Sequence, residues 1–81
     1  MWFVYILLCS DGSFYTGVSN NPQKRFLDHK SGKGGRYTRS HKPSKIIYLE
    51  KFFTKKEALS REKEIKAWSR SKKIQILRLK A

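Results

Sequence analysis

The fold of this chain is decided by the stretch WFVYILLCSDGSFYTGV, residues 2–18. The first part is apolar at every position from Trp2 to Leu8. Because a strand covered on one face only would alternate, this run predicts a central strand covered on both faces. Residues 10–13 form a strong turn signal, and residues 14–18 predict a second strand. The stretch is therefore predicted to be an antiparallel β-hairpin.

The length of the hairpin loop decides which side chains share a face. A two-residue loop would place Tyr5 and Tyr15 on opposite faces of the sheet. A three-residue loop, residues 10–12, pairs Tyr5 with Gly17 and brings the two tyrosines to one face. The opposite face then collects five apolar side chains, those of Val4, Ile6, Leu8, Phe14 and Val18. We predict the three-residue loop, with Gly12 at positive φ as the left-handed residue of a bulged turn.

The rest of the chain predicts one further strand and three helices. They are a helix from Pro22 to about Lys30, a basic loop up to Pro43, a strand from Lys45 to Phe53, a helix to about Trp68, and a short last helix. The helix starts are marked by capping residues, namely Asn20 or Asn21, Thr54 with Glu57, and Ser69 or Ser71. The order β-β-α-β-α-α predicts an α+β fold, with helices packed on a three-stranded sheet that contains antiparallel pairs, in a single domain of residues 1–81.

The composition favours a nucleic-acid partner. Of 81 residues, 19 are Lys or Arg and 6 are Asp or Glu, which gives a formal net charge of +13. Such a charge suits a polyphosphate, and it is spread along the chain rather than set opposite one apolar stripe, which argues against a membrane surface. The only apolar run is too short to cross a bilayer, and a lone Cys9 fits the reducing cytoplasm.

Four polar residues fall where chemistry is possible. Tyr5 lies inside the central strand, where its hydroxyl needs a partner or a cleft. A core tyrosine with its hydroxyl at the sheet edge is the alternative, and the same choice applies to Tyr15. Arg25 and His29 lie four residues apart on one helix, so they share a face and suit a phosphate. Alternatively, both simply face solvent.

Glu62 interrupts the apolar stripe formed by Ala58, Leu59 and Ile65 on its helix. A carboxylate at the margin of a core usually has a metal or an ionic partner. A plain i,i+4 ion pair with Lys66 is the alternative. The residues alone do not decide between these two readings.

The glycine-rich segment, residues 32–36, lacks the spacing of a phosphate-binding P-loop and follows a helix rather than a strand. It favours a basic loop that lies on a nucleic-acid backbone. We expect Lys33 and Arg36 in this loop, and Lys24 and Lys66 on the helices, to contact nucleic acid.

Taken together, these residues resemble the GIY-YIG nuclease family, and the closest likeness is to its small stand-alone bacterial members. The first motif is present as Phe3-Val4-Tyr5 and the second as Tyr15-Thr16-Gly17, followed by Arg25, His29 and Glu62 in the family order. The match covers about residues 2 to 68. Phe3 and Thr16 depart from the motifs, and neither replaces a side chain with a chemical role.

The resemblance implies a Mg²⁺-dependent (or Mn²⁺-dependent) DNA endonuclease, with Glu62 as metal ligand and Tyr5 helping to deprotonate the attacking water. For that, Tyr5 would need cationic neighbours that lower its pKa. Arg25 would stabilise the developing charge, Tyr15 and His29 would position the phosphate or relay protons, and Gly17 would allow close approach of the substrate.

Three hypotheses remain open. The first is an endonuclease, structure-selective and active in repair or recombination. The second is a nucleic-acid-binding module that keeps the fold without cleaving. The third is a basic interaction subunit of a larger complex. In the family, targeting usually comes from additional domains, so a protein partner is expected to supply it.

Overall fold

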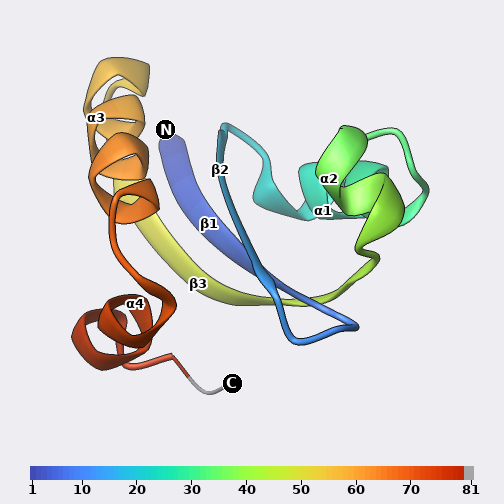
Figure 1. Ribbon diagram of the computed structural model, residues 1–81. Coiled ribbons are helices and arrows are strands. Elements are labelled where there is room, and N and C mark those ends of the chain that lie inside the picture. The colour runs from blue at the N-terminus through green and yellow to red at the C-terminus, as the bar shows by residue number, and fades with distance from the viewer. Residues whose placement is uncertain (80–81) are drawn as a thin grey trace.

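The computed structural model describes residues 1–79 and contains seven elements of secondary structure (Figure 1). They are β1 (Trp2–Cys9), β2 (Phe14–Ser19), α1 (Pro22–Lys30), α2 (Arg36–Ser40), β3 (Pro43–Phe52), α3 (Lys55–Lys66) and α4 (Arg70–Leu77). The predicted α+β class and the three-stranded sheet are confirmed, and both strand pairs are antiparallel. The last two residues of the predicted domain, 80–81, lie outside the described residues.

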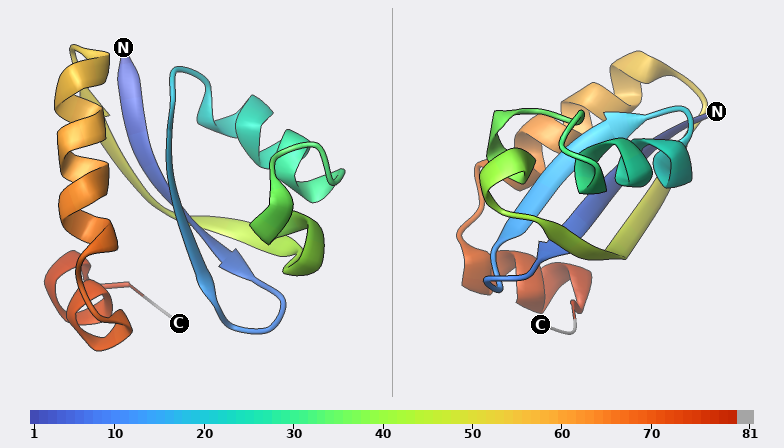
Figure 2. Two further views of the ribbon diagram at one scale, coloured as in Figure 1. Left: turned by 45° about the horizontal axis from the view of Figure 1, so that its top comes forward. Right: turned by 90° about the vertical axis from the view of Figure 1, so that its right-hand side faces the viewer.

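The sheet has the strand order β2-β1-β3, so β1 is the central strand, as its apolar run predicts. Helices α1 and α2 lie on one side of the sheet, and α3 and α4 lie on the other (Figures 1 and 2). Four consecutive side chains of β1, Val4 to Leu7, are at most 1% exposed. The molecule therefore has three layers, and β1 contributes side chains to both interfaces.

The hairpin between β1 and β2 has the predicted three-residue loop. Tyr5 pairs with Gly17, and Cys9 N–H donates to the carbonyl of Ser13 at 2.8 Å, so residues 10–12 form the loop. Gly12 has φ +86°, in the left-handed region that favours glycine. In the same register Leu7 pairs with Tyr15, so Tyr5 and Tyr15 lie on the same face of the sheet, as predicted.

The apolar core lies between the sheet and the pair α3 and α4. Its buried members are Val4, Ile6, Ala58, Ile65 and Leu79, and the predicted Phe14 and Val18 pack against them. Leu8, which we also expected in this core, is only half-buried and is not part of the cluster. The sequence therefore identifies the core face correctly and extends it one residue too far toward the hairpin loop.

Capping side chains begin three of the helices. Asn21, rather than Asn20, accepts from the backbone N–H of Lys24, and Pro22 occupies the first turn of α1. Thr54 and Glu57 form the predicted capping box of α3. Ser69, rather than Ser71, caps α4.

The element order and several boundaries differ from the prediction. The segment expected as a basic loop contains the short helix α2, so the element order is β-β-α-α-β-α-α. Strand β3 begins at Pro43, two residues earlier than expected, and α3 ends at Lys66 rather than Trp68. Helix α2 was missed because its glycine-rich, basic composition is that of a loop. It is held by the buried Thr38, whose hydroxyl is hydrogen-bonded to His29 of α1.

We predict that Gly12→Ala lowers the free energy of unfolding by about 1 kcal/mol. A Cβ at this position would meet no atom within 4 Å, so the loss comes from the left-handed backbone alone. Urea unfolding of the two proteins measures the difference. Gly12→Asn is the matched control, and it should lose less because asparagine tolerates this conformation better. Equal stability of all three proteins would contradict the assigned loop.

Candidate active site

Tyr5 lies in the middle of β1, and its ring passes over the backbone of Gly17 on β2. A Cβ at Gly17 would lie 2.5 Å from the Tyr5 hydroxyl oxygen and 2.6 Å from Cζ, which leaves no room for any side chain. Since β2 is an edge strand, the hydroxyl reaches toward the edge of the sheet. The ring of Tyr15 lies on the same face, with its centroid 6.4 Å from that of Tyr5.

His29 of α1 meets this hydroxyl from the second layer. Its Nε2 lies 2.9 Å from the Tyr5 hydroxyl oxygen, and its Nδ1 lies 2.7 Å from Thr38 Oγ1 on α2. The imidazole is 0% exposed, so the alternative of a solvent-facing histidine is wrong. Gly34 packs so closely that any side chain there would overlap the His29 ring. Both ring nitrogens are thus fixed by hydrogen bonds, and β1, α1 and α2 meet at His29.

Burial lowers the pKa of His29, and the positive charge of Arg25 lowers it further. The imidazole is therefore neutral at pH 7, with one N–H and one acceptor nitrogen. One of its two hydrogen bonds is donated by the ring and the other is accepted by it. Tyr5, His29 and Thr38 form a continuous chain of hydrogen bonds.

The pKa of Tyr5 is raised to about 12, mainly by burial, and Tyr15 and the carboxylate of Glu62 raise it further. Arg25 acts in the opposite direction through its charge and a hydrogen bond, without cancelling the effect of burial. Arg25 thus acts in the direction that a base at neutral pH would need, but the pKa of Tyr5 is raised on balance and not lowered. At neutral pH Tyr5 is a protonated phenol, because the effect of burial outweighs that of Arg25.

Arg25 lies on α1, one turn before His29. Its Nη2 donates to the carbonyl of Gly34 at 2.8 Å, and its Nη1 is 3.9 Å from Asp28 Oδ2. The side chain is 39% exposed, so it is anchored at one end while part of the guanidinium faces solvent. It affects the pKa of both Tyr5 and His29, which places its charge at the site.

Glu62 lies on α3, in the opposite layer, yet its charge acts on Tyr5. The side chain is 18% exposed, and its Oε2 is 3.4 Å from Lys66 Nζ, so the predicted alternative of an i,i+4 pair does form. Glu64 differs, because it pairs with Arg61, which also binds Glu50 at 2.9 Å. Glu64 therefore has a structural role. Glu62 is the carboxylate whose charge acts on Tyr5.

A divalent cation at Glu62 fits the donor chemistry. Residues 1–79 contain no cluster of three or more His, Cys, Asp or Glu side chains that could hold a metal. A metal held entirely by protein ligands is thus not supported by this part of the chain. Mg²⁺ is commonly bound by one or two carboxylates together with waters and phosphate oxygens. Glu62, largely buried and with one lysine as partner, suits that arrangement.

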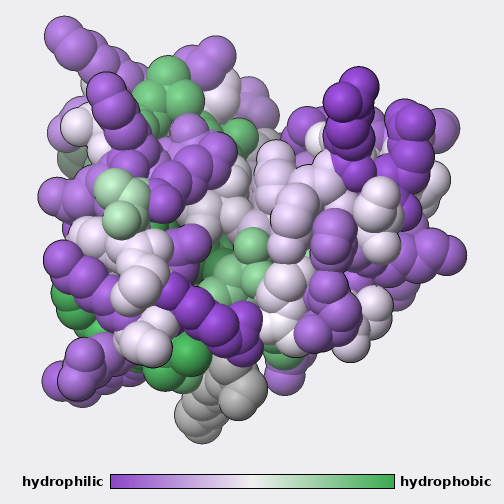
Figure 3. Space-filling model, in the orientation of Figure 1, coloured by the Kyte–Doolittle hydropathy of each residue, from purple (hydrophilic) through white to green (hydrophobic). Residues whose placement is uncertain are grey.

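The residues expected to contact nucleic acid are mostly at the surface. Lys24, Lys33 and Arg36 are exposed, and strongly hydrophilic residues cover most of the face shown in Figure 3. Lys66 is half-exposed and paired with Glu62. The space beside Gly17 is filled by the Tyr5 ring, and a direct contact of Gly17 with nucleic acid stays a prediction.

Four residues near the site were not singled out in the sequence. Gly34 and Thr38 enclose His29, and Tyr37 and His41 extend the group of rings beyond Tyr15. All four belong to or flank α2, whose helical nature was missed. The spacing of Tyr37 and His41, four residues apart, would have placed them on one face had the helix been recognised.

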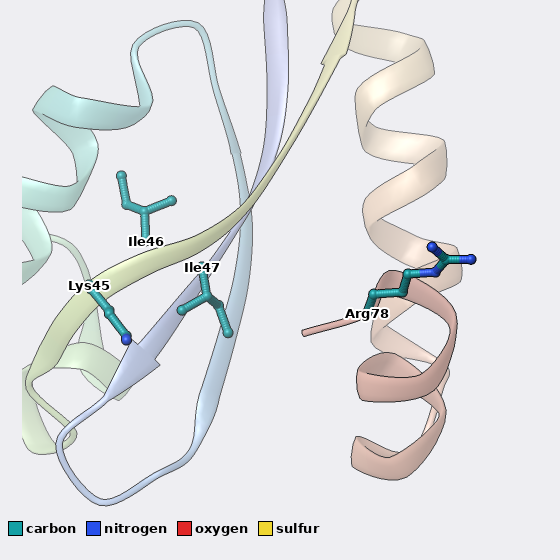
Figure 4. Close-up of a pocket in the computed structure, with 4 residues that line it drawn as sticks. All are labelled: Lys45, Ile46, Ile47 and Arg78. Carbon is teal, nitrogen blue, oxygen red and sulfur yellow. The ribbon is translucent and has the colours of Figure 1, made fainter. Parts of the chain in front are cut away.

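An open hollow lies elsewhere on the molecule. It has a volume of about 350 Å³ and is lined by Lys45, Ile46 and Ile47 of β3 and by Arg78 after α4 (Figure 4). It shares no residue with the group around Tyr5. The candidate catalytic residues thus lie around Tyr5 and do not line this hollow.

Comparison with known proteins identifies the family to which this chain belongs. The sequence profile of the GIY-YIG catalytic domain matches residues 1–75. This chain belongs to the GIY-YIG family. Among its relatives, a UPF0213 protein of Staphylococcus saprophyticus is 45% identical over 75 residues, which cover 93% of this chain and 92% of that protein. A UPF0213 protein of Bacillus pumilus is 48% identical over 71 residues, which cover 88% and 72%.

The fold of this GIY-YIG domain is also found in a solved relative. The solution NMR structure of the UPF0213 protein BH0048 from Bacillus halodurans matches with a TM-score of 0.61 at 43% identity, covering 96% of this chain and 84% of that one. The resemblance predicted from Phe3-Val4-Tyr5 and Tyr15-Thr16-Gly17 is therefore confirmed. Among the described residues, no helix has the length and apolarity needed to span a bilayer.

We predict that Gly17→Ala destabilises the protein by about 1–3 kcal/mol, because the new methyl group displaces the buried Tyr5 ring. In a Tyr5→Leu background, where the ring is absent, the same change should have a much smaller effect. Unfolding of the four proteins measures this coupling. Additive losses would show that Gly17 is needed for its backbone and not for the space above it.

Proposed function

We propose that this protein is a divalent-metal-dependent endonuclease that cleaves phosphodiester bonds of DNA. The proposal rests on one feature, the convergence at the Tyr5 hydroxyl. His29 bonds to that oxygen at 2.9 Å, and the charges of Arg25 and Glu62 both act on it. Arg25 and His29 come from α1 on one side of the sheet and Glu62 from α3 on the other, whereas a purely structural tyrosine needs only one partner.

The high pKa of Tyr5 favours a relay over a standing phenolate. With a pKa of about 12, Tyr5 carries its proton at neutral pH. When the attacking water gives a proton to the Tyr5 oxygen, Tyr5 passes its own proton to His29 Nε2. The neutral imidazole can accept it if Nδ1–H donates to Thr38. Thr38 is then a positioning residue that fixes the tautomer.

Arg25 would meet the charge that develops on the phosphate. Its anchored Nη2 orients the guanidinium, while the exposed part can donate to phosphate oxygens. Glu62 would hold the divalent cation, which when bound neutralises charge on the phosphate and the leaving oxygen. The net charge of +13 supports DNA as the partner, because phosphate neutralisation releases counterions.

A second candidate is a DNA-binding module that does not cleave. One observation favours it, the ion pair between Glu62 and Lys66 at 3.4 Å, which occupies the carboxylate. The same basic surface would then serve binding alone. Cleavage assays separate the two candidates directly.

We predict that Glu62→Gln abolishes Mg²⁺-dependent cleavage of flapped and branched DNA and leaves binding in EDTA within about twofold. The carboxamide keeps the size of the side chain and loses the charge needed for a divalent cation. Glu64→Gln is the matched control on the same helix and should cleave normally. A similar loss of cleavage in both variants would contradict the assignment of the metal to Glu62. No cleavage by the wild-type protein with either Mg²⁺ or Mn²⁺ would favour the binding module.

We predict that Arg25→Ala lowers the cleavage rate about 10²–10³-fold, the usual effect of removing a donor to a developing charge. Lys24→Ala, one residue away and exposed, should instead weaken binding and reduce the salt slope by about one. Single-turnover rates and affinities over a salt series measure both effects. If the two variants lose the same rate, Arg25 is one more member of a basic surface.

A further inference from the structure

An aromatic pair continues the site outward along α2. The ring of Tyr37 stacks on Tyr15, with centroids 5.9 Å apart at 28°, and on His41, with centroids 4.2 Å apart at 9°. Tyr15 in turn lies 4.7 Å from the His29 ring and 6.4 Å from Tyr5. A row of rings thus leads from the buried Tyr5 hydroxyl to the surface of the molecule.

The outer end of this row is open to solvent, and polar contacts hold its last ring. Tyr37 is 39% exposed, and the side chain of His41 is 37% exposed. His41 Nδ1 lies 3.0 Å from the carbonyl oxygen of Tyr37, and Nε2 lies 3.7 Å from Asp11 Oδ2. These contacts hold the imidazole parallel to the phenol ring. An exposed aromatic pair that is already ordered loses little conformational entropy when a ligand binds.

Helix α2 therefore has two different faces. Thr38 points inward and is 1% exposed against His29, while Tyr37 and His41 are displayed outward. Exposed cations surround the pair in the sequence, namely Lys33, Arg36, Arg39 and Lys42. Rings among cations suit single-stranded nucleic acid, because cations follow its backbone while bases stack on the rings.

We propose that the Tyr37–His41 pair binds an unpaired nucleobase, which stacks on the face of the His41 ring that Tyr37 does not cover, close to the phosphate that Arg25 is proposed to meet. The choice of DNA as ligand rests on the proposed function. Bases within a duplex already stack on each other and present only their edges in the grooves. The pair therefore selects DNA in which at least one nucleotide near the cleavage point is unpaired or turned out of the stack. Flaps, gaps and junctions offer such nucleotides, and a continuous duplex does not.

The test compares Tyr37→Leu with Phe53→Leu, a matched loss of an exposed ring. Phe53 is 81% exposed and follows β3, outside the row of rings. Fluorescence anisotropy in EDTA measures the affinity for a single-stranded oligonucleotide and for its duplex. Tyr37→Leu removes the ring on which His41 stacks. We expect it to bind the single strand about tenfold more weakly, the order of one base–aromatic stack, and the duplex within about twofold. Phe53→Leu should match the wild type on both. Equal losses on both DNAs, or equal effects of both variants, would overturn the proposal.

A second measurement guards against misfolding of the variant. Wild-type protein is titrated with single strands that carry one abasic nucleotide at successive positions. One position should lose about tenfold in affinity, and Tyr37→Phe, which keeps the ring, should show the same dependence. Affinity that is independent of the abasic position overturns the stacking site. Because these assays contain EDTA, they measure binding without cleavage. A failure to cleave DNA would therefore count against the proposed function and not against the stacking site.

Discussion

The phenol ring of Tyr5 lies across the backbone of Gly17, and the rest of the site depends on this contact. It requires glycine at position 17, because even a methyl group would meet the hydroxyl oxygen. It also requires the register set by a three-residue loop with Gly12 in the left-handed region. A loop one residue shorter would no longer pair Tyr5 with Gly17 and would place Tyr15 on the opposite face of the sheet from Tyr5. The contact directs the hydroxyl to the one place where His29 can reach it.

The two faces of the sheet are built from different interactions. On the side of α3 and α4 the core is apolar, and it supplies most of the hydrophobic stabilisation of a small domain. On the side of α1 and α2 a fully buried His29 joins Tyr5 to Thr38. A buried polar group is costly if it is unpaired, so these bonds fix α1 and α2 to the sheet. The same bonds therefore serve stability and the proposed proton relay, and changes at His29 affect both.

Local signals in the sequence predicted the hairpin register, the helix caps and the core face. Each depends on residues close together in the chain, as with Asn21 and Lys24 or Thr54 and Glu57. Helix α2 was not predicted, because a contact nine residues away, between His29 and Thr38, holds it in place. The roles of Tyr15, Arg25, His29 and Glu62 beside Tyr5 were inferred from the resemblance, whereas the hydrogen bond between Tyr5 and His29 was not predicted. The direction of the pKa shift of Tyr5 was not predicted either, because net charge describes the whole surface whereas burial acts at the atom.

The acidic residues show which carboxylate is available for chemistry. Five of the six have structural partners: Asp11 accepts from Ser13, Asp28 lies beside Arg25, Glu50 and Glu64 bind Arg61, and Glu57 caps α3. Within residues 1–79, Glu62 has only Lys66, itself 53% exposed. The lysine of this pair is open to solvent although Glu62 is largely buried. Because an ion pair open to solvent contributes only about 0–1 kcal/mol, a cation or phosphate can take the place of Lys66 at small loss. Lys66, once released, remains one helical turn away, where it can meet the phosphate. The pair that argues against catalysis in the free protein is thus compatible with catalysis once DNA is bound.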